Sequence, residues 1–588
     1  AQLVEQDLPR LLDALADKLH RKPRFALLKG RQNYACLAKV DGSDSDQTLQ
    51  ADGHQWLGEL SRTEQQITRV RTWSARTQTG DRSDLDPGVD DRMWRQVSVS
   101  STECVGAHRC RFGEECFAER ARDRARQADV VVTNHALLAL DMLHDGSVLP
   151  PHDVLIIDEA HELPGHVTNV SRAQLQPEAL RRLVRRVGGK LSLDAVERFE
   201  TAEAALEAAL ASSPPGRLSP LPSELSQALT LLEGAASAAA ATLSATNSGA
   251  GAKGSDDEQS VAAHQDLTQL RELAEVTQRL LTDSTHDVAW VDRDDSDRRS
   301  LIVAPLSVAG RLGSQLFAER TVIATSATLT LGGSFDNVER SFGLSSAVES
   351  SDEAQSDAPQ WHSEDVGSPF TYPEQGVLYV AAHLPRLAAS GLPEVAQREL
   401  IELVQAAGGR TLGLFSSRRA ADQAAEAVRA ATEFPVLLQG DDSLGNLVRQ
   451  FRDSPESCLF GVLSLWQGVD VPGPACQLVV IDRIPFPRPD DPLVAARSAA
   501  ADSAGGSGFA SVYVPHAAVR LAQGAGRLIR SCTDRGVVAV LDSRLHHASY
   551  GSYLRRSVPP LWYTTTPAVV RGALQRLDEG ARAAGSPA

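Results

Sequence analysis

The chain has 588 residues, of which 42% are hydrophobic and 23% are charged, and its net charge is −17. At about 150 residues per domain, this length predicts roughly four domains or subdomains, and the composition excludes a disordered chain. The acidic balance excludes a protein that coats DNA through overall basic charge, but it allows a local basic groove. We find no signal peptide or membrane-spanning run, so we expect a cytoplasmic protein that does not bind membranes.

The N-terminal region begins with a predicted amphipathic helix and a short strand at 24–28. Residues 18–39 contain seven Lys or Arg and no acidic residue, which indicates either a solvated helix face or a phosphate-binding stretch. Two buried strands, 129–133 and 154–157, flank a predicted helix at 136–143. Continuous apolar strands separated by helices are typical of a parallel α/β sheet.

The middle of the chain is helical in character from 164 to 300, although we expect its low-complexity tract, Ala235–Ser260, to be a loop. The parallel sheet is predicted to resume at 300–303 and 321–324, before an acidic linker. A second α/β unit follows. Its predicted strands are 411–415, 459–463, 478–481 and 537–541.

Two adjacent carboxylates, Asp158 and Glu159, directly follow an apolar strand. Ligands of α/β proteins bind at the carboxyl edge of the sheet, where this strand ends. There, Asp158 is suited to hold Mg²⁺, and Glu159 to orient and deprotonate a water molecule at a γ-phosphate. The alternative is a buried strand that ends in an acidic turn.

The segment 523–530 is rich in glycine and arginine. If it is helical, Gln523, Arg527 and Arg530 lie at i, i+4 and i+7 on one face. Guanidinium groups presented in this way stabilise charge on a transferring phosphoryl group, an effect of about 10³-fold or more in rate. The alternative is a solvated or salt-bridged helix face, which explains less well why two glycines interrupt it.

Small or polar residues follow three further predicted strands. Hydroxyls there can cap a helix whose N-terminus binds phosphate, or relay between a nucleotide site and a bound strand. A glycine allows the backbone to approach a phosphate or ribose, and a nearby carboxylate can accept a hydrogen bond from a hydroxyl group. The candidates are Ser326 and Thr328, Ser416 and Ser417, and Gly468 and Asp470.

Four of the seven cysteines lie in the first 116 residues, in a polar context: Cys36, Cys104, Cys110 and Cys116. The paired C-x₂-C spacing of zinc ribbons does not occur among them. One distant and three close cysteines can hold an iron–sulfur cluster, so a cluster is preferred over four unrelated thiols. The other three cysteines adjoin apolar strands and are expected to be packing residues.

In this order the segments resemble the superfamily 2 iron–sulfur DNA helicases of the XPD/DinG type, with the bacterial DinG branch most similar, over almost the whole chain. The residues that carry the resemblance are Asp158–His161 as motif II, Ser326–Thr328 as motif III, Leu412–Ser417 as motif IV, Trp466–Asp470 as motif V, Gln523–Arg530 as motif VI, the four cysteines, and Asp482–Pro489.

This resemblance implies an α/β fold with two RecA-like parallel-sheet motor domains, the first interrupted by an iron–sulfur insertion and a helical arch insertion. The expected boundaries are 1–35, 127–163 and 301–344 for the first motor domain, 36–126 for the iron–sulfur domain, 164–300 for the arch, 345–368 for a linker and 369–588 for the second motor domain.

The resemblance further implies an ATP-dependent DNA helicase that translocates 5′ to 3′ on single-stranded DNA, in DNA repair or in resolving replication conflicts. The implied partners are single-stranded DNA and forked or structured duplexes. The implied cofactors are a [4Fe–4S] cluster, Mg²⁺ and ATP. The implied oligomeric state is a monomer. The implied site residues are Asp158, Glu159, Gln523, Arg527 and Arg530 for catalysis; His161, Gly468 and Asp470 for nucleotide; Ser326, Thr328, Ser416 and Ser417 for nucleic acid; and Cys36, Cys104, Cys110 and Cys116 for the cluster.

One element of the family pattern is missing from the printed sequence. No G-x-x-x-x-G-K-[ST] phosphate loop precedes the cysteines, and the first residue is not Met. We therefore expect an N-terminally incomplete helicase chain that, as printed, hydrolyses ATP poorly. Two alternatives stay open: a non-hydrolysing nucleic-acid-binding remnant of such a helicase, and a nucleic-acid-binding module stabilised by zinc.

Overall fold

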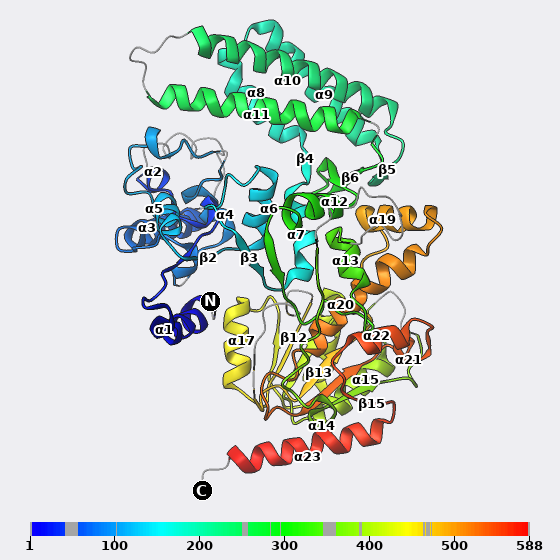
Figure 1. The fold of residues 1–588 in the computed structure, drawn as a ribbon. Coiled ribbons are helices and arrows are strands. Elements are labelled where there is room, and N and C mark those ends of the chain that lie inside the picture. Colours follow the sequence, from blue (N-terminus) through cyan, green and yellow to red (C-terminus); the bar gives the residue numbers. More distant parts are fainter. Residues whose placement is uncertain are drawn as a thin grey trace. The chain divides into compact units, whose positions relative to one another are not determined.

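The computed structural model describes most of the chain, with its elements labelled in Figure 1. The residues described are 3–41, 57–86, 88–101, 103–249, 257–282, 284–294, 296–344, 360–386, 391–462, 465, 471 and 473–585. They belong to two compact units. The first unit comprises residues 1–153 and 165–306, and the second comprises 154–164 and 307–588.

A seven-stranded sheet forms the centre of the second unit, and every strand pair in it is parallel. Its order is β11 (Val436–Leu438), β12 (Cys458–Gly461), β10 (Thr411–Leu414), β13 (Leu478–Ile481), β14 (Gly536–Val540), β9 (Gly376–Val380) and β15 (Trp562–Thr564). The four strands predicted from the sequence, β10, β12, β13 and β14, are confirmed, and they lie next to one another in the sheet.

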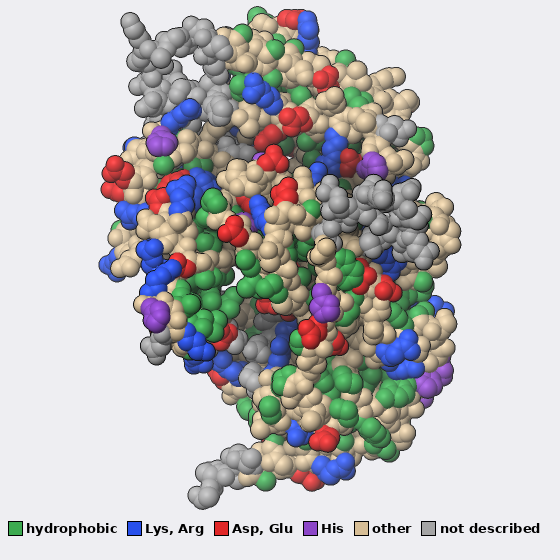
Figure 2. Space-filling model, in the orientation of Figure 1, with side chains coloured by type: hydrophobic (Ala, Val, Ile, Leu, Met, Phe, Trp, Pro, Cys, Tyr) green, Lys and Arg blue, Asp and Glu red, His purple; other side chains and the backbone are tan. Residues whose placement is uncertain are grey.

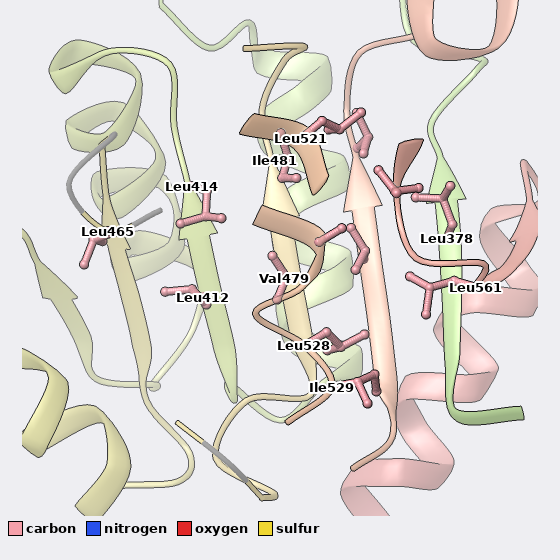
Figure 3. Close-up of a cluster of buried hydrophobic side chains, with 14 of the residues drawn as sticks. Leu378, Leu412, Leu414, Leu465, Val479, Ile481, Leu521, Leu528, Ile529 and Leu561 are labelled. Atoms are coloured by element: carbon pink, nitrogen blue, oxygen red, sulfur yellow. The ribbon is translucent and has the colours of Figure 1, made fainter. Parts of the chain in front are cut away.

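Alternate side chains of this sheet enter two separate hydrophobic clusters. Val479 and Ile481 of β13 belong to the first cluster, whereas Leu478 and Val480 belong to the second. Figure 3 shows the first cluster, in which Leu521 faces the strands. Both faces are therefore covered, which explains why these strands read as continuous apolar runs rather than alternating ones.

Helices supply the other side of each cluster. The first is closed by α17 (Leu444–Asp453), α20 (Val514–Ala525) and α22 (Gly551–Ser557). The second is closed by α15 (Glu394–Ala406), α16 (Arg418–Ala431) and α23 (Pro567–Gly585). Other α-helices among the described residues of 307–588 are α12 (Ala309–Leu312), α13 (Asp336–Phe342), α14 (Tyr372–Gln375), α19 (Pro492–Ser503) and α21 (Arg544–His547).

The second unit also contains a separate parallel pair, β3 (Val154–Ile157) with β8 (Thr321–Ala324). This pair confirms two predicted strands. Val154, Ile156 and Ile323 are 55%, 68% and 49% exposed, although parallel strands are normally covered on both faces. The pair thus carries uncovered apolar side chains, whereas in the larger sheet the exposed large apolar side chains among the described residues lie on the edge strand β15, at Trp562 and Tyr563.

In the first unit, β1 (Phe25–Leu27) pairs in parallel with β2 (Val130–Val132). The amphipathic helix predicted at the N-terminus is α1 (Leu8–Leu19), which buries Leu8 and Leu12. The helix predicted at 136–143 is α6 (His135–Leu143). Other helices of this part of the chain are α2 (Leu37–Val40), α3 (Leu57–Ser74), α4 (Asp91–Val97), α5 (Phe117–Arg126) and α7 (Leu163–Val170).

Four long helices form the region predicted to be helical between 164 and 300: α8 (Pro177–Val187), α9 (Leu193–Ser212), α10 (Ser223–Gly249) and α11 (Asp257–Leu281). The loop expected over Ala235–Ser260 is wrong for its described residues, since 235–249 and 257–260 are helical. Alanine is the strongest helix former, and Ala236 and Ala239 are buried in the core of this bundle.

A four-stranded antiparallel sheet accompanies these helices, in the order β4 (Ala173–Leu175), β7 (Arg299–Pro305), β6 (Asp287–Arg293) and β5 (Gly216–Leu218). The strand predicted at 300–303 therefore exists as β7, but its assignment to a parallel sheet is wrong. Its apolar run is continuous because Leu301, Ile302 and Val303 are all buried, and burial on both faces hides the direction of pairing.

One described helix, α10, contains a 23-residue stretch, Ser223–Ala245, long and apolar enough by composition to span a membrane, with a mean hydropathy of 1.3. The apolar residues of this stretch pack inside the protein. Leu225, Leu229 and Leu232 are fully buried in the helical bundle, so packing against α9 and α11 accounts for the composition.

Candidate active site and cysteine cavity

The two carboxylates predicted at the end of a strand do follow β3 directly. Asp158 and Glu159 are both exposed, and Asp158 Oδ1 accepts a hydrogen bond from the Glu159 N–H at 3.0 Å. Glu159 has φ 49° and ψ 43°, a left-handed conformation that is rare outside glycine and is often found at functional sites. This turn takes the chain out of the strand and leaves the Glu159 carboxylate accessible.

A chain of side-chain hydrogen bonds connects Glu159 to α20. The Ser326 hydroxyl donates to Glu159 Oε2 at 2.9 Å and lies 2.8 Å from His161 Nδ1. On the other side of the ring, Gln523 Nε2 lies 2.7 Å from His161 Nε2. A His161 ring that carries its proton on Nδ1 is compatible with these three contacts, with Gln523 donating to His161, His161 to Ser326, and Ser326 to Glu159.

Backbone hydrogen bonds hold the partners of this chain together. The Ala160 N–H donates to the Thr325 carbonyl at 3.0 Å, and the Thr325 N–H donates to the Ile157 carbonyl at 2.8 Å. Thr328, which is buried, donates its N–H to Ser326 Oγ at 3.1 Å. The structure thus places Ser326 and Thr328 beside the carboxylates, and their contact with nucleic acid stays a prediction.

The segment 523–530 is not one helix. Helix α20 ends at Ala525, so Gln523 is helical whereas Arg527 and Arg530 follow the helix end. The predicted single helical face is therefore wrong. Two glycines weaken the helix here, and Leu528 and Ile529 turn into the hydrophobic cluster of the large sheet (Figure 3), which redirects the backbone that carries the two arginines.

Ser416 and Ser417 follow β10, as predicted, and they have different environments. Ser417 is the N-cap of α16, its hydroxyl accepting from the Ala420 N–H at 3.2 Å. Ser416 donates its hydroxyl to Asp482 Oδ2 at 2.7 Å and its N–H to Oδ1 at 2.9 Å. Asp482, at the end of β13, is fully buried, so it fixes the loop that leads into α16.

Burial raises the pKa of Asp482 to about 6, while the Ser416 hydroxyl and Arg483 act in the opposite direction. Because the folded-state pKa is raised, the stability that this group contributes is greatest below about pH 4 and is lost as the pH rises through about 6. We expect Asp482→Asn, which does not ionise, to gain relative to wild type by up to about 3 kcal/mol between pH 4 and 7.

Urea unfolding of both proteins at several pH values measures this difference. A constant difference between Asp482→Asn and wild type across the range would contradict the prediction.

The predicted nucleotide residues Gly468 and Asp470 lie outside the described residues. Elsewhere in the second unit, the structure gathers aromatic rings that sequence reasoning missed. Phe509 lies 5.4 Å from both Phe486 and Tyr550, measured between ring centroids, and Phe509 is exposed. The only sequence signal was the phenylalanine in the stretch Asp482–Pro489, since the rings come from three segments far apart in the sequence.

The four predicted cysteine ligands line a single cavity in the first unit, together with Arg31, Tyr34, Phe112 and Glu119. All four are half-buried and none forms a disulfide. Burial raises the pKa of the Cys36 thiol, while the N–H groups of Lys39 and Ala38 act in the opposite direction. This soft donor set suits an iron–sulfur cluster or zinc.

The loop between two of these cysteines depends on a close backbone approach. Gly113 donates its N–H to the Cys110 carbonyl at 2.8 Å, and a Cβ on Gly113 would lie 2.1 Å from the Ala107 carbonyl oxygen. Only glycine fits at this position, which allows Cys110 and Cys116 to reach the same cavity.

Charge on the molecular surface is mixed. On the face drawn in Figure 2, Lys and Arg side chains lie among Asp and Glu side chains, and the described residues of that face show no wide basic band.

Comparison with known proteins places these features in context. The Helicase C-terminal domain family matches residues 400–561. ATP-dependent helicase DinG of Mycobacterium tuberculosis is 48% identical over 584 residues, covering 98% of this chain and 86% of the relative. ATP-dependent DNA helicase YoaA of Escherichia coli is 31% identical over 580 residues, covering 95% and 85%. A solved XPD helicase aligns with a TM-score of 0.49 and 14% identity, over 95% of this chain and 90% of that one.

Proposed function

This chain belongs to the XPD/DinG-type family of ATP-dependent DNA helicases, and on that premise we propose that it translocates 5′ to 3′ on single-stranded DNA and unwinds forked or structured duplexes. We place this activity in DNA repair or in resolving replication conflicts. The observation that carries the proposal is the hydrogen-bond chain from Glu159 through Ser326 and His161 to Gln523. It connects a carboxylate suited to hydrolysis with a helix of the RecA-like seven-stranded domain.

For ATP hydrolysis, Asp158 would hold Mg²⁺ at the end of β3, where the ion neutralises charge on the phosphates. Glu159 accepts the proton of the attacking water, and the Ser326 hydroxyl orients this carboxylate. Gly468 and Asp470 contact the nucleotide, while Arg527 and Arg530 stabilise charge on the transferring phosphoryl group. Because Gln523 touches His161, a change at the nucleotide reaches α20 through side chains.

For DNA binding, we assign the phosphate contacts to Ser326, Thr328, Ser416 and Ser417. Ser417 caps α16, a 14-residue helix whose N-terminus carries partial positive charge at the carboxyl edge of the sheet. The exposed ring of Phe509, supported by Phe486 and Tyr550, offers a surface on which unpaired bases stack, at about 1–3 kcal/mol per base.

For the cysteine cavity, we propose a [4Fe–4S] cluster held by Cys36, Cys104, Cys110 and Cys116, which would tie together residues 36–126. Four thiols on one cavity support this assignment. When bound, such a cluster supplies a rigid cross-link between separate loops. We further propose that 164–300 form an arch inserted in the first motor domain, and that the protein acts in the cytoplasm as a monomer.

Strand polarity tests the proposed function. The full-length protein is expected to unwind a duplex with a 5′ single-stranded tail faster than the same duplex with a 3′ tail, and to leave a blunt duplex intact, because translocation begins on the tail. Gel separation of the products with ATP and Mg²⁺ measures this. Equal rates on both tails, or a preference for the 3′ tail, would refute the direction, and tight DNA binding without ATP turnover would favour a non-hydrolysing binder.

A further inference from the structure

A buried carboxylate, Asp534, follows the segment 523–530. Asp534 is only 6% exposed. Its Oδ2 accepts hydrogen bonds from the N–H groups of Arg530 and Ser531, both at 2.7 Å. Its Oδ1 accepts from the Ser531 hydroxyl at 2.7 Å and from the Gly473 N–H at 3.1 Å. Four donors thus converge on one side chain that belongs to none of the sequence segments identified above.

These contacts fix the backbone at Arg530. Ile529, the preceding residue, is buried in the hydrophobic cluster (Figure 3), and the Arg530 N–H is held by Asp534. The loop that follows is also held by Gln375, because its Nε2 donates hydrogen bonds to the Ser531 and Asp534 carbonyls at 3.1 and 3.2 Å. The exposed Arg530 side chain is therefore attached to a backbone position that is held in place.

The same carboxylate reaches a second segment. Gly473, with φ +88°, comes directly after 466–472, the region in which Gly468 and Asp470 lie. A hydrogen bond from its N–H to Asp534 fixes the end of that region relative to Arg530. One side chain thereby contacts the backbone both at Arg530 and at Gly473.

We propose that Asp534 is a positioning residue for ATP hydrolysis, which holds the backbone of Arg530 and ties it to the segment that ends at Gly473. This proposal rests on the role proposed above for Arg530 and deepens it. An arginine that stabilises a transferring phosphoryl group acts only from the correct position, and misplacement of a catalytic group by about 1 Å can cost about 10²-fold in rate.

The variant Asp534→Asn tests this in the full-length protein. Asn has the same shape, but its NH₂ group must face one of the two pairs of donors, so half of the hydrogen bonds are lost. The expected result is a fall in the kcat of DNA-stimulated ATP hydrolysis of about 10–10²-fold, with the KM for ATP close to wild type. Asp266→Asn is the matched control, since Asp266 is a buried carboxylate of the arch that binds Arg186 and Lys190 at 2.7 Å each; its kcat should not change.

A double variant separates positioning from general structural damage. If Asp534 acts through Arg530, then Asp534→Asn combined with Arg530→Ala is no slower than Arg530→Ala alone. Multiplied losses, or wild-type kcat in Asp534→Asn, would overturn the proposal. Should Asp534→Asn fail to fold, Ser531→Ala removes one donor only and is expected to lower kcat less; unchanged kcat there would also count against the proposal. Wild-type kcat in Arg530→Ala would instead refute the proposed role of that arginine.

Discussion

Replacement of Glu159 by Gln in the full-length protein is expected to slow ATP hydrolysis by about 10²–10⁴-fold, the usual contribution of a general base. Gln keeps an oxygen that accepts from the Ser326 hydroxyl, so the hydrogen-bond chain to Gln523 is retained and only the proton acceptor is lost. ATP binding and single-stranded DNA binding should therefore remain close to wild type. Phosphate release with and without single-stranded DNA measures the loss, and a fluorescent nucleotide measures binding.

A carboxylate elsewhere in the same unit controls for the change of charge. Glu433 is exposed, between α16 and β11, and Glu433→Gln should hydrolyse ATP at the wild-type rate. If Glu159→Gln kept wild-type turnover, the base would have to be a different group. If the Glu159→Gln variant also lost nucleotide binding, Glu159 would contribute to binding of ATP rather than to the hydrolysis step.

The substitution Cys110→Ser is expected to remove iron and acid-labile sulfide from the protein and to unfold residues 36–126 locally. Cys110 lines the cavity with the three other cysteines, and a hydroxyl is a poor substitute for a thiolate ligand. The two clusters that cover the seven-stranded sheet contain no residue of 36–126. The large sheet should therefore keep its cooperative unfolding transition, while hydrogen exchange becomes fast in 36–126.

Anaerobically purified protein is the sample for these measurements, and Cys532→Ser is the matched control. Cys532 is exposed and does not line the cavity, so this variant should keep its full metal content. Zinc without iron or sulfide in the wild type would contradict the cluster and support the zinc-stabilised alternative. Loss of all cooperative unfolding in Cys110→Ser would contradict the independence of the large sheet.

The sequence predicts four neighbouring strands of the large sheet and misses the interior strand β9 and the outermost strands β11 and β15. Strands β10, β12, β13 and β14 are continuous apolar runs because both faces are covered, and such runs are readable from sequence. The outermost strands β11 and β15 have only three residues each, too few to show a period. The antiparallel sheet that accompanies α8 to α11 was missed because apolar content identifies a strand and not the direction of its neighbour.

In the candidate site, too, some residues could be predicted from the sequence and others could not. Asp158 and Glu159 were predictable because two carboxylates at the end of an apolar strand form a local pattern. The bonds of His161 were not, since they join residues 165 and 362 positions apart. Asp534 gave no signal at all: a single aspartate in a polar loop is ordinary, and only the fold brings four donors to it.

The position of β9 in the large sheet has a consequence for synthesis of the protein. This strand lies between β14 and β15, both of which are translated much later in the chain. At ordinary bacterial elongation rates, a ribosome needs roughly 10–40 s to proceed from β9 to β15. Strand β14 is made before β15, so one edge of β9 has no partner in this sheet until β14 has emerged, and its other edge has none until β15 has emerged.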